Sequence, residues 1–149
     1  MSNENEEMKV ISAEGKILGR LASRIASMVK DGKTVRVVKS EDAVISGDEQ
    51  KVLNDYKTKK DRGARDRGPY FPKRPDRILK RTVKGMLPSN PSGRDALDNV
   101  RTYLDVPEEF EDFEEVDVKE GDDLLNRNYV KLGRVSKHIG WKGKRGVNQ

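Results

Sequence analysis

The chain has 149 residues, a formal net charge of +5, 38% charged residues, one histidine and no cysteine. This composition is enough for one domain, and it excludes disulfides, a thiolate zinc site, a cysteine nucleophile and the usual multi-histidine metal cluster. The polar, acidic N-terminus differs from a signal peptide, and no stretch approaches the ~18 apolar residues of a membrane span, so a soluble cytosolic protein is expected.

The first third of the chain predicts a strand, a helix and two more short strands. Residues 8–12 are strand-like, and the apolar positions of residues 18–29 recur on one helical face before the stop signal that Gly32 offers. Residues 34–38 and 43–46 are the next strand candidates. Because a parallel crossover needs a dozen or more residues, these two runs are expected to form a tight antiparallel pair or one kinked strand.

The middle of the chain predicts two helices that flank a basic loop. A helix is expected over residues 48–56, followed by a loop over residues 57–69. Pro75 begins a second, amphipathic helix that ends between residues 85 and 88. The apolar stripe of that helix consists of Ile78, Leu79, Val83, Met86 and Leu87. Its other face is cationic, so burial of the stripe would aim the cations outward.

A last helix and strand complete the predicted core. A capping-box spacing that starts at Ser92 predicts a short helix over residues 94–99, and residues 100–104 are strand-like. The alternation of strands and helices predicts an α/β fold with a small, mostly parallel sheet covered by helices. The chain is then expected to leave the core, which gives a core domain over residues 1–106 and an acidic, then basic, C-terminal extension over residues 107–149.

Charge is segregated along the chain in blocks. Residues 57–94 carry 13 lysines and arginines against 3 acids, residues 105–123 carry 11 acids and one lysine, and residues 124–149 carry 7 cations and no acid. Like charges within one block repel each other unless a polyanion neutralises them, so nucleic acid is the first candidate partner. The alternative is an ordinary solvated surface, although such surfaces usually intersperse both signs.

The basic block combines three features that RNA binding uses. Lysine and arginine neutralise phosphates, arginine and aromatic rings can stack on splayed bases, and glycine allows close backbone approach. The loop and the residues after it contain Lys57, Lys59, Lys60, Arg62, Gly63, Arg65, Arg67, Gly68, Tyr70, Phe71, Lys73 and Arg74. On the following helix, Arg77, Arg81 and Lys84 have the spacing i, i+4, i+7 and should project from one face.

Other motifs give weaker signals for chemistry. Residues 15–20 follow a strand and open a helix, but they lack the residues of a Walker loop or a dinucleotide fingerprint. The acidic residues 105–123 lack the spacing of a calcium-binding loop. They could instead screen the basic blocks, or dock a few apolar side chains on their own domain or on a neighbour, with Phe110, Phe113, Val116 and Val118 as candidates. His138 has no acid nearby in sequence, which disfavours a general base. Trp141 could anchor the basic terminus or pack as an apolar plug.

Several strings resemble motifs of the thirteenth large-subunit ribosomal protein family. The two longest are residues 13–23, Ala-Glu-Gly-Lys-Ile-Leu-Gly-Arg-Leu-Ala-Ser, and residues 81–88, Arg-Thr-Val-Lys-Gly-Met-Leu-Pro. Residues 44–47 and the pair Gly93 and Arg94 are similar to further landmarks of the family, so the resemblance covers roughly residues 8–106. Residues 129–142 look like the archaeal and eukaryotic branch.

The resemblance implies a three-layer α/β/α fold around a four-stranded parallel sheet, and a non-enzymatic protein bound to large-subunit ribosomal RNA. It also implies that RNA contacts lie on the basic loop, on the cationic helix face and on the first helix. The expected RNA-binding residues are Arg20, Arg24, Lys57, Lys59, Lys60, Arg62, Arg65, Arg67, Tyr70, Lys73, Arg74, Arg77, Arg81 and Lys84. Further cationic candidates are Arg94, Lys142, Lys144 and Arg145.

The resulting hypothesis is a structural protein of the cytoplasmic ribosome that positions ribosomal RNA during assembly of the large subunit. Its expected partners are that RNA and neighbouring large-subunit proteins, with no cofactor, no small-molecule substrate, no membrane and no obligate homo-oligomer. One rival is an enzyme with a nucleotide pocket at the strand C-termini. Another is a regulator that binds messenger RNA, which composition cannot separate from ribosomal RNA binding because both need the same cations.

Overall fold

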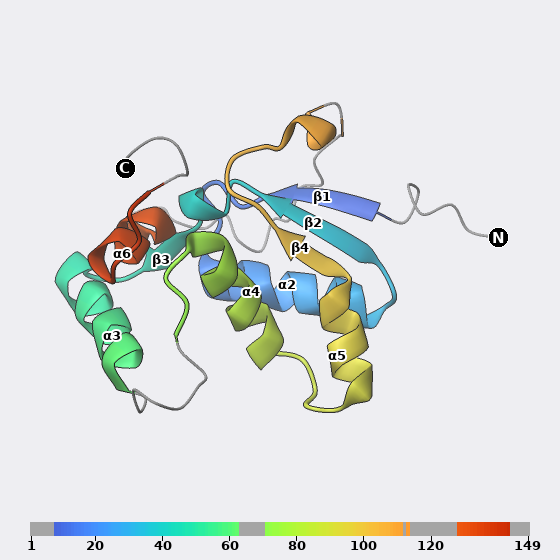
Figure 1. Cartoon of the computed structure of the whole chain (residues 1–149), viewed down its shortest axis with the longest axis horizontal. Helices are drawn as coiled ribbons and strands as arrows, with labels where there is room; N and C mark the ends of the chain where they lie inside the picture. Colours follow the sequence, from blue (N-terminus) through green and yellow to red (C-terminus); the bar gives the residue numbers. More distant parts are fainter. Residues whose placement is uncertain (1–7, 63–70, 112, 114–127, 144–149) are drawn as a thin grey trace.

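The computed structural model describes residues 8–62, 71–111, 113 and 128–143 (Figure 1). Its first elements are β1 (Met8–Ser12), α2 (Leu18–Lys30) and β2 (Thr34–Val38), and β1 pairs with β2 in parallel. All three confirm the sequence-based expectation. Gly32 follows α2 with a φ of +91°, the left-handed conformation that lets a chain leave a helix without strain at a Cβ.

The expected arrangement of the next two strands is wrong. A 3₁₀ turn, η1 (Ser40–Asp42), separates β2 from β3 (Val44–Ser46), and the two strands lie in different sheets. β3 pairs antiparallel with β5 (Tyr129–Lys131), a strand that the sequence analysis did not identify. Lys39 precedes η1 with a φ of +58°, so a left-handed residue redirects the chain out of the first sheet.

The helices α3 (Glu49–Arg62) and α4 (Pro75–Gly85) lie in the middle of the chain. α4 has its expected bounds. α3 is longer than expected and includes residues 57–62, so the expectation of a loop from residue 57 is wrong. No glycine or proline interrupts the helix before Gly63, and the Thr58 hydroxyl donates to the Asn54 carbonyl oxygen at 3.0 Å. The lysines of this segment therefore stand on a helix.

The helix α5 (Pro91–Asp98) begins three residues before its expected start. Asn90 caps it, because the Asn90 side-chain oxygen accepts a hydrogen bond from the Gly93 N–H at 2.9 Å. Pro91 occupies the first helical position, where a missing N–H costs nothing. The capping role expected of Ser92 therefore belongs to Asn90.

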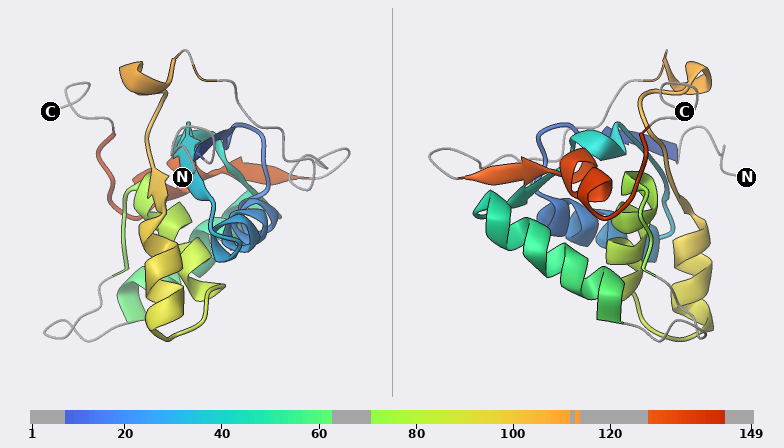
Figure 2. Two further views of the ribbon diagram at one scale, coloured as in Figure 1. Left: turned by 90° about the vertical axis from the view of Figure 1, so that its right-hand side faces the viewer. Right: turned by 60° about the vertical axis from the view of Figure 1, so that its left-hand side comes forward.

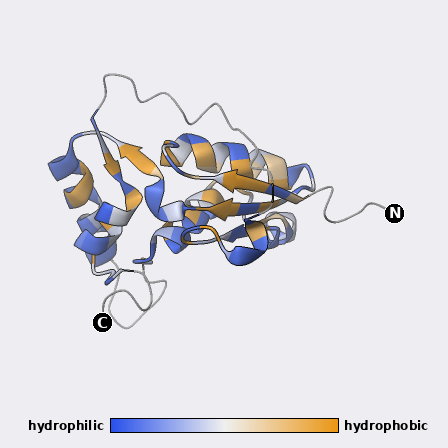
Figure 3. Cartoon of the chain, turned by 90° about the horizontal axis from the view of Figure 1, so that it is seen from above, coloured by the Kyte–Doolittle hydropathy of each residue, from blue (hydrophilic) through white to orange (hydrophobic). Residues whose placement is uncertain are grey.

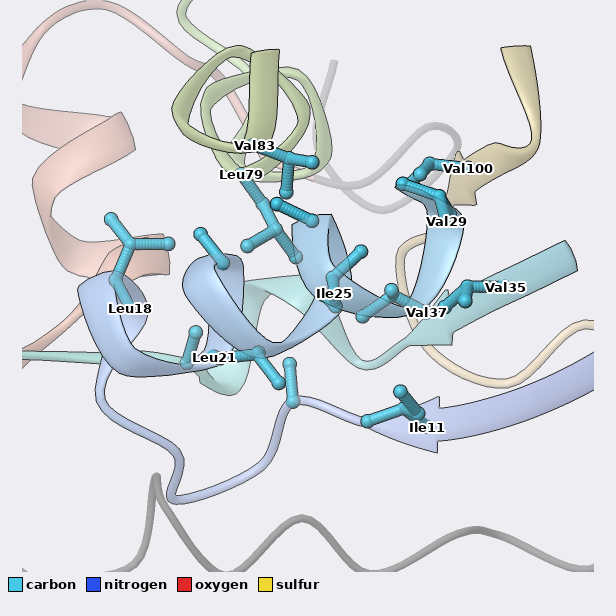
Figure 4. Close-up of a cluster of buried hydrophobic side chains, with 14 of the residues drawn as sticks. Ile11, Leu18, Leu21, Ile25, Val29, Val35, Val37, Leu79, Val83 and Val100 are labelled. Carbon is cyan, nitrogen blue, oxygen red and sulfur yellow. The ribbon is translucent and has the colours of Figure 1, made fainter. Parts of the chain in front are cut away.

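The main core lies between the three-stranded sheet and the helices α2, α4 and α5 (Figure 1). The sheet has the order β1-β2-β4, with β4 (Val100–Thr102) parallel to β2. Side chains alternate across strands, so Ile11, Val35 and Val37 point into this core, where α2 supplies Leu21 and Ile25 (Figure 4). This burial holds α2 and α4 in fixed positions relative to the sheet.

The opposite face of the sheet carries a smaller cluster. Val10 and Val38 point to this side and pack with Phe110 of the 3₁₀ turn η2 (Glu108–Phe110). The Phe110 ring lies 5.3 Å from the Tyr103 ring and 5.7 Å from the Phe113 ring, measured between centroids. The expected docking of apolar side chains from this segment onto the protein is confirmed for these two phenylalanines, whereas residues 116 and 118 lie outside the described residues.

The C-terminal part of the described chain belongs to the same body, as Figure 2 shows for α6 (Leu132–His138) beside α3. Leu132 and Ile139 are buried in the main core, and Val130 and Val135 pack against residues of α3. For the described residues, the expectation that the chain leaves the core after residue 106 is therefore wrong. Apolar residues recur within positions 130–139, a pattern typical of a segment that packs on a core, although the many cations of this region favour an exposed tail.

The α/β class and the mostly parallel sheet are confirmed. The sheet has three parallel strands instead of the four that the resemblance implied, because β3 belongs to the two-stranded sheet. Hydrophobic residues concentrate on the strands and on stripes of the helices (Figure 3). Among the described residues, no helix combines the length and apolarity that crossing a membrane requires. The division into domains at residue 106 stays a prediction.

Gly93 provides a test of how tightly α5 packs. A Cβ at this position would overlap the Pro88 carbonyl oxygen, so we expect Gly93→Ala to lower the free energy of unfolding by about 1–3 kcal/mol through overpacking. A Cβ at Gly19 in α2 would meet nothing within 4 Å, so Gly19→Ala should be neutral or stabilising by up to about 1 kcal/mol. Urea denaturation measures both. Equal stability of Gly93→Ala and the wild type would contradict the contact.

Candidate nucleic-acid interface

The helix α4 has three exposed cations on the side opposite its buried residues. Ile78, Leu79 and Val83 are buried on one side, whereas Arg77, Arg81 and Lys84 are exposed, as their spacing predicted. None of these three cations forms a salt bridge within the described part of the chain. The helix therefore presents a row of positive charges that is not neutralised by the protein's own described carboxylates.

The N-terminal end of α4 is held by an ion pair. The Arg74 guanidinium lies 3.0 Å from the carboxylate of Asp76, which is buried. The Asp76 carbonyl oxygen in turn accepts a hydrogen bond from the Thr102 hydroxyl of β4 at 2.8 Å. Because Arg74 takes part in this ion pair, it is less available to bind RNA than Arg77, Arg81 and Lys84.

The helix α3 carries Lys57, Lys59 and Lys60 as exposed side chains. Arg62 is the last residue of this helix. The Lys59 ammonium lies 4.6 Å from the centre of the Tyr56 ring, a cation–π contact. A helical support gives these lysines fixed spacing, which a flexible loop would not.

An aromatic pair joins α3 to the start of α4. The rings of Tyr56 and Phe71 meet edge to face with centroids 6.0 Å apart, and the Arg81 guanidinium lies 5.3 Å from the Phe71 ring centre. These side chains line a groove whose other walls are Lys59, Ile78, Thr82 and Gly85. The groove combines ring surfaces with two cations, Lys59 and Arg81. Tyr56 is not among the residues that the sequence predicted to bind RNA.

The pKa of Tyr56 is raised by its surroundings. The main cause is burial of the phenol, which disfavours the phenolate, and the negative charge of Asp55 adds to the effect. The phenol is therefore protonated at neutral pH. An uncharged ring beside Lys59 and Phe71 adds no anion that would repel a phosphate.

The polar face of α2 forms a second cationic surface. Arg20 and Arg24 are exposed there, as expected, and line a shallow hollow together with Gly19, Ser23 and Ser27. Small residues between two arginines leave room for a phosphate chain to approach the helix backbone. Neither arginine forms a salt bridge with a described residue.

A third group of cations lies where α6 ends. The Lys73 side chain runs along Gly140, and its ammonium is 3.3 Å from where a Gly140 Cβ would lie. This brings Lys73 close in space to the segment that contains the exposed Lys142. Trp141 is half-buried beside them, and its backbone N–H donates to the Ser136 carbonyl oxygen at 2.8 Å.

Among the described candidates, Arg94 stands on none of these three surfaces. Arg94 is exposed on α5, and His138 is exposed at the end of α6. Arg65, Arg67, Tyr70, Lys144 and Arg145 lie outside the described residues. The described part of the chain contains no group of three or more histidine, cysteine, aspartate or glutamate residues that could hold a metal ion.

The raised pKa of Tyr56 predicts a pH dependence of stability. The folded state favours the protonated phenol, so this contribution is complete below the unfolded pKa of about 10 and is lost as the pH rises through the higher folded pKa. We expect the free energy of unfolding of the wild type to fall relative to Tyr56→Phe above about pH 10 and to keep a constant difference below it. Urea denaturation at successive pH values measures this, with Tyr129→Phe as the control for removing an exposed phenol. A difference that is constant throughout would contradict the prediction.

Comparisons with known proteins agree with the resemblance. Residues 6–109 match the family described as Ribosomal protein L13. The chain is 45% identical over 146 residues to "Large ribosomal subunit protein uL13" of Archaeoglobus fulgidus, covering 93% of this chain and 91% of the relative. The protein of the same name from Methanosarcina barkeri is 45% identical over 139 residues, covering 91% and 99% of the two chains. That from Saccharolobus solfataricus is 41% identical over 143 residues, covering 93% and 96%.

These three relatives are archaeal, which agrees with the expected archaeal and eukaryotic branch of the family. The matched family consists of ribosomal structural proteins and not of enzymes, so the expectation of a non-enzymatic protein is confirmed and the enzyme hypothesis is wrong. With a match over residues 6–109 and relatives that are aligned along most of its length, the chain belongs to the ribosomal protein L13 family.

Proposed function

We propose that the chain is a structural constituent of the large subunit of the cytoplasmic ribosome, where it binds and positions ribosomal RNA during assembly. The names of its relatives support the subunit, and the cationic surfaces support the RNA. The observation that carries the proposal is a set of eight exposed cations on three packed helices, none of which is in a salt bridge with a described residue. They are Arg20, Arg24, Lys57, Lys59, Lys60, Arg77, Arg81 and Lys84.

The mechanism is electrostatic and geometric. Each cation neutralises a phosphate and releases condensed counterions, which supplies affinity without reading sequence. Because α4 rises about 1.5 Å per residue, Arg77 and Lys84 are about 10 Å apart along the helix axis. The buried side of α4 keeps this spacing fixed, so the helix can orient an RNA backbone as well as attract it.

Positioning of RNA also explains why the cations lie on rigid elements. An exposed lysine on a mobile loop pays conformational entropy when it is ordered by a phosphate, whereas a helix has already fixed the backbone. Arg20 and Arg24 on α2, Lys59 on α3 and Arg81 on α4 all stand on such supports. RNA helices that contact more than one of these protein helices would be held at a defined angle. We propose that neighbouring large-subunit proteins complete this arrangement.

The direct test is association with the ribosomal subunit. We expect the tagged chain to sediment with large subunits at low salt and to be released as the salt concentration is raised, because its contacts are largely ionic. Binding to fragments of large-subunit RNA should also exceed binding to unrelated structured RNAs of equal length. Equal binding to both RNA sets would favour a general RNA-binding protein, and the absence of cosedimentation would refute the proposal.

The salt dependence of RNA binding gives a quantitative prediction. If the eight cations each neutralise a phosphate, the logarithm of the affinity should fall against the logarithm of salt concentration with a slope of about −6 to −7. The combined variant Arg77→Gln, Arg81→Gln and Lys84→Gln should reduce the steepness of this slope by about 2 to 3. Filter binding or fluorescence anisotropy over a salt series measures it.

A matched control removes the same charge elsewhere. The variant Lys30→Gln, Lys33→Gln and Arg101→Gln changes three exposed cations that are not among the eight. We expect it to change the slope less than the α4 variant does. Equal slopes for the two variants would show that net charge alone determines binding, which would contradict a defined interface.

A further inference from the structure

We propose that the groove between α3 and α4 binds an unpaired nucleobase of the RNA. The inference rests on the proposed function and deepens it, because it assigns single-stranded or looped RNA, and not duplex RNA, to one named site. The groove is lined by Tyr56, Phe71 and the two flanking cations Lys59 and Arg81, with Thr82 and Gly85 at its α4 side. Nucleobases present flat π faces, and proteins bind them on aromatic rings and on arginine planes.

The two rings form a rigid platform. Tyr56 and Phe71 are half-buried, and both pack against the main hydrophobic core on their inner sides. Their edge-to-face contact, with centroids 6.0 Å apart, fixes each ring against the other. A stacking surface that is already ordered loses little conformational entropy when a base arrives.

The two cations are placed to serve both the base and its phosphates. In the free protein, the Lys59 ammonium lies 4.6 Å from the Tyr56 ring centre and the Arg81 guanidinium 5.3 Å from the Phe71 ring centre. Both side chains are exposed, where cation–π contacts are weak, so they can turn toward phosphates on either side of the base. The Arg81 plane can also stack on the base itself.

The α4 side of the groove has room for a ligand. A Cβ at Gly85 would meet no atom within 4 Å, so the glycine borders open space. The Thr82 hydroxyl donates its proton to the Ile78 carbonyl oxygen at 2.9 Å, which leaves the lone pairs of the hydroxyl oxygen as acceptors. A flat base that enters here would meet ring surface on one side and polar groups at its edge.

This groove selects against paired RNA for a geometric reason. Bases within an A-form helix are stacked on their neighbours, so their faces are covered and cannot lie on a protein ring. Electrostatics alone gives the opposite preference, because the dependence of affinity on salt is steeper for duplexes than for single strands. A preference for unpaired RNA would therefore come from stacking.

The test compares two RNAs of 24 nucleotides. One is a hairpin with a loop of six uridines, and the other is a blunt duplex made of two 12-nucleotide strands. We expect the wild-type protein to bind the hairpin about fivefold or more tightly than the duplex at the same salt concentration. Phe71→Leu removes a ring but keeps an apolar side chain, and Gly85→Leu fills the open space. Both should bring the ratio of the two affinities close to one.

The control and the outcomes separate the two proposals. Arg77→Gln removes an exposed cation outside the groove, so it should weaken binding to both RNAs and keep their ratio. A wild-type protein that binds neither RNA in a salt-dependent manner would overturn the proposed function. Salt-dependent binding with equal affinity for the two RNAs, or a preference that survives both groove variants, would overturn only the groove.

A second measurement needs no variant. The hairpin is prepared with 5-iodouridine in its loop, irradiated in complex with the wild-type protein and digested, and the cross-linked peptides are identified by mass spectrometry. We expect the cross-links at Tyr56 or Phe71. Cross-links confined to peptides that contain neither residue would overturn the proposal even if the variants failed to fold.

Discussion

The structure depends on the burial of one side of α4 against α2. Leu79 and Val83 of α4 lie in the same buried cluster as Leu21 and Ile25 of α2, and Ile11, Val35 and Val37 of the sheet complete it (Figure 4). Apolar burial of this kind is the main favourable term in folding. It also determines where charge can go, because a helix with one side buried must place its lysines and arginines on the other. The cationic surface is therefore a consequence of core packing.

The same packing leaves most described cations of the basic block without a carboxylate partner among the described residues. Of the cations in the basic block, Arg74 has a carboxylate partner in Asp76, whereas the exposed arginines of α4 have none among the described residues. Surface ion pairs contribute little to stability, so the absence of such partners costs the folded chain little. Mutual repulsion between neighbouring cations is a larger consideration, and it decreases when a polyanion covers them. Stability and RNA binding are thus coupled through the same side chains.

The sequence predicted those helices and strands that are determined by the pattern of their own residues. The bounds of β1, α2, β2 and α4 follow from apolar periodicity and from stops such as Gly32. The sequence did not reveal that β3 pairs with β5, because three-residue strands roughly 85 positions apart carry no local sign of their partner. The basic composition after residue 56 predicts a loop, but α3 continues to Arg62 because lysine is a good helix former.

The candidate site shows the same division. The spacing of Arg77, Arg81 and Lys84 was enough to place them on one exposed face. The contact of Tyr56 with Phe71 could not be predicted from the sequence, because it depends on how the segment before α4 lies against α3 in the folded chain. A position on a helix face can be read from periodicity, but a groove between two helices needs the tertiary arrangement.

The pairing of β3 with β5 has a consequence for the order of folding during synthesis. The Leu132 N–H donates to the Ala43 carbonyl oxygen at 2.7 Å, and Leu132 and Ile139 fill part of the main core. A nascent chain that has emerged only as far as β4 can pair its parallel strands, but it leaves the β3 edge and this part of the core open to water. Closing them requires residues roughly 85 positions apart in sequence to meet, which is slow because bringing distant parts of a chain together costs entropy. The nascent chain therefore exposes apolar core residues to water until α6 has been synthesised and packs on them.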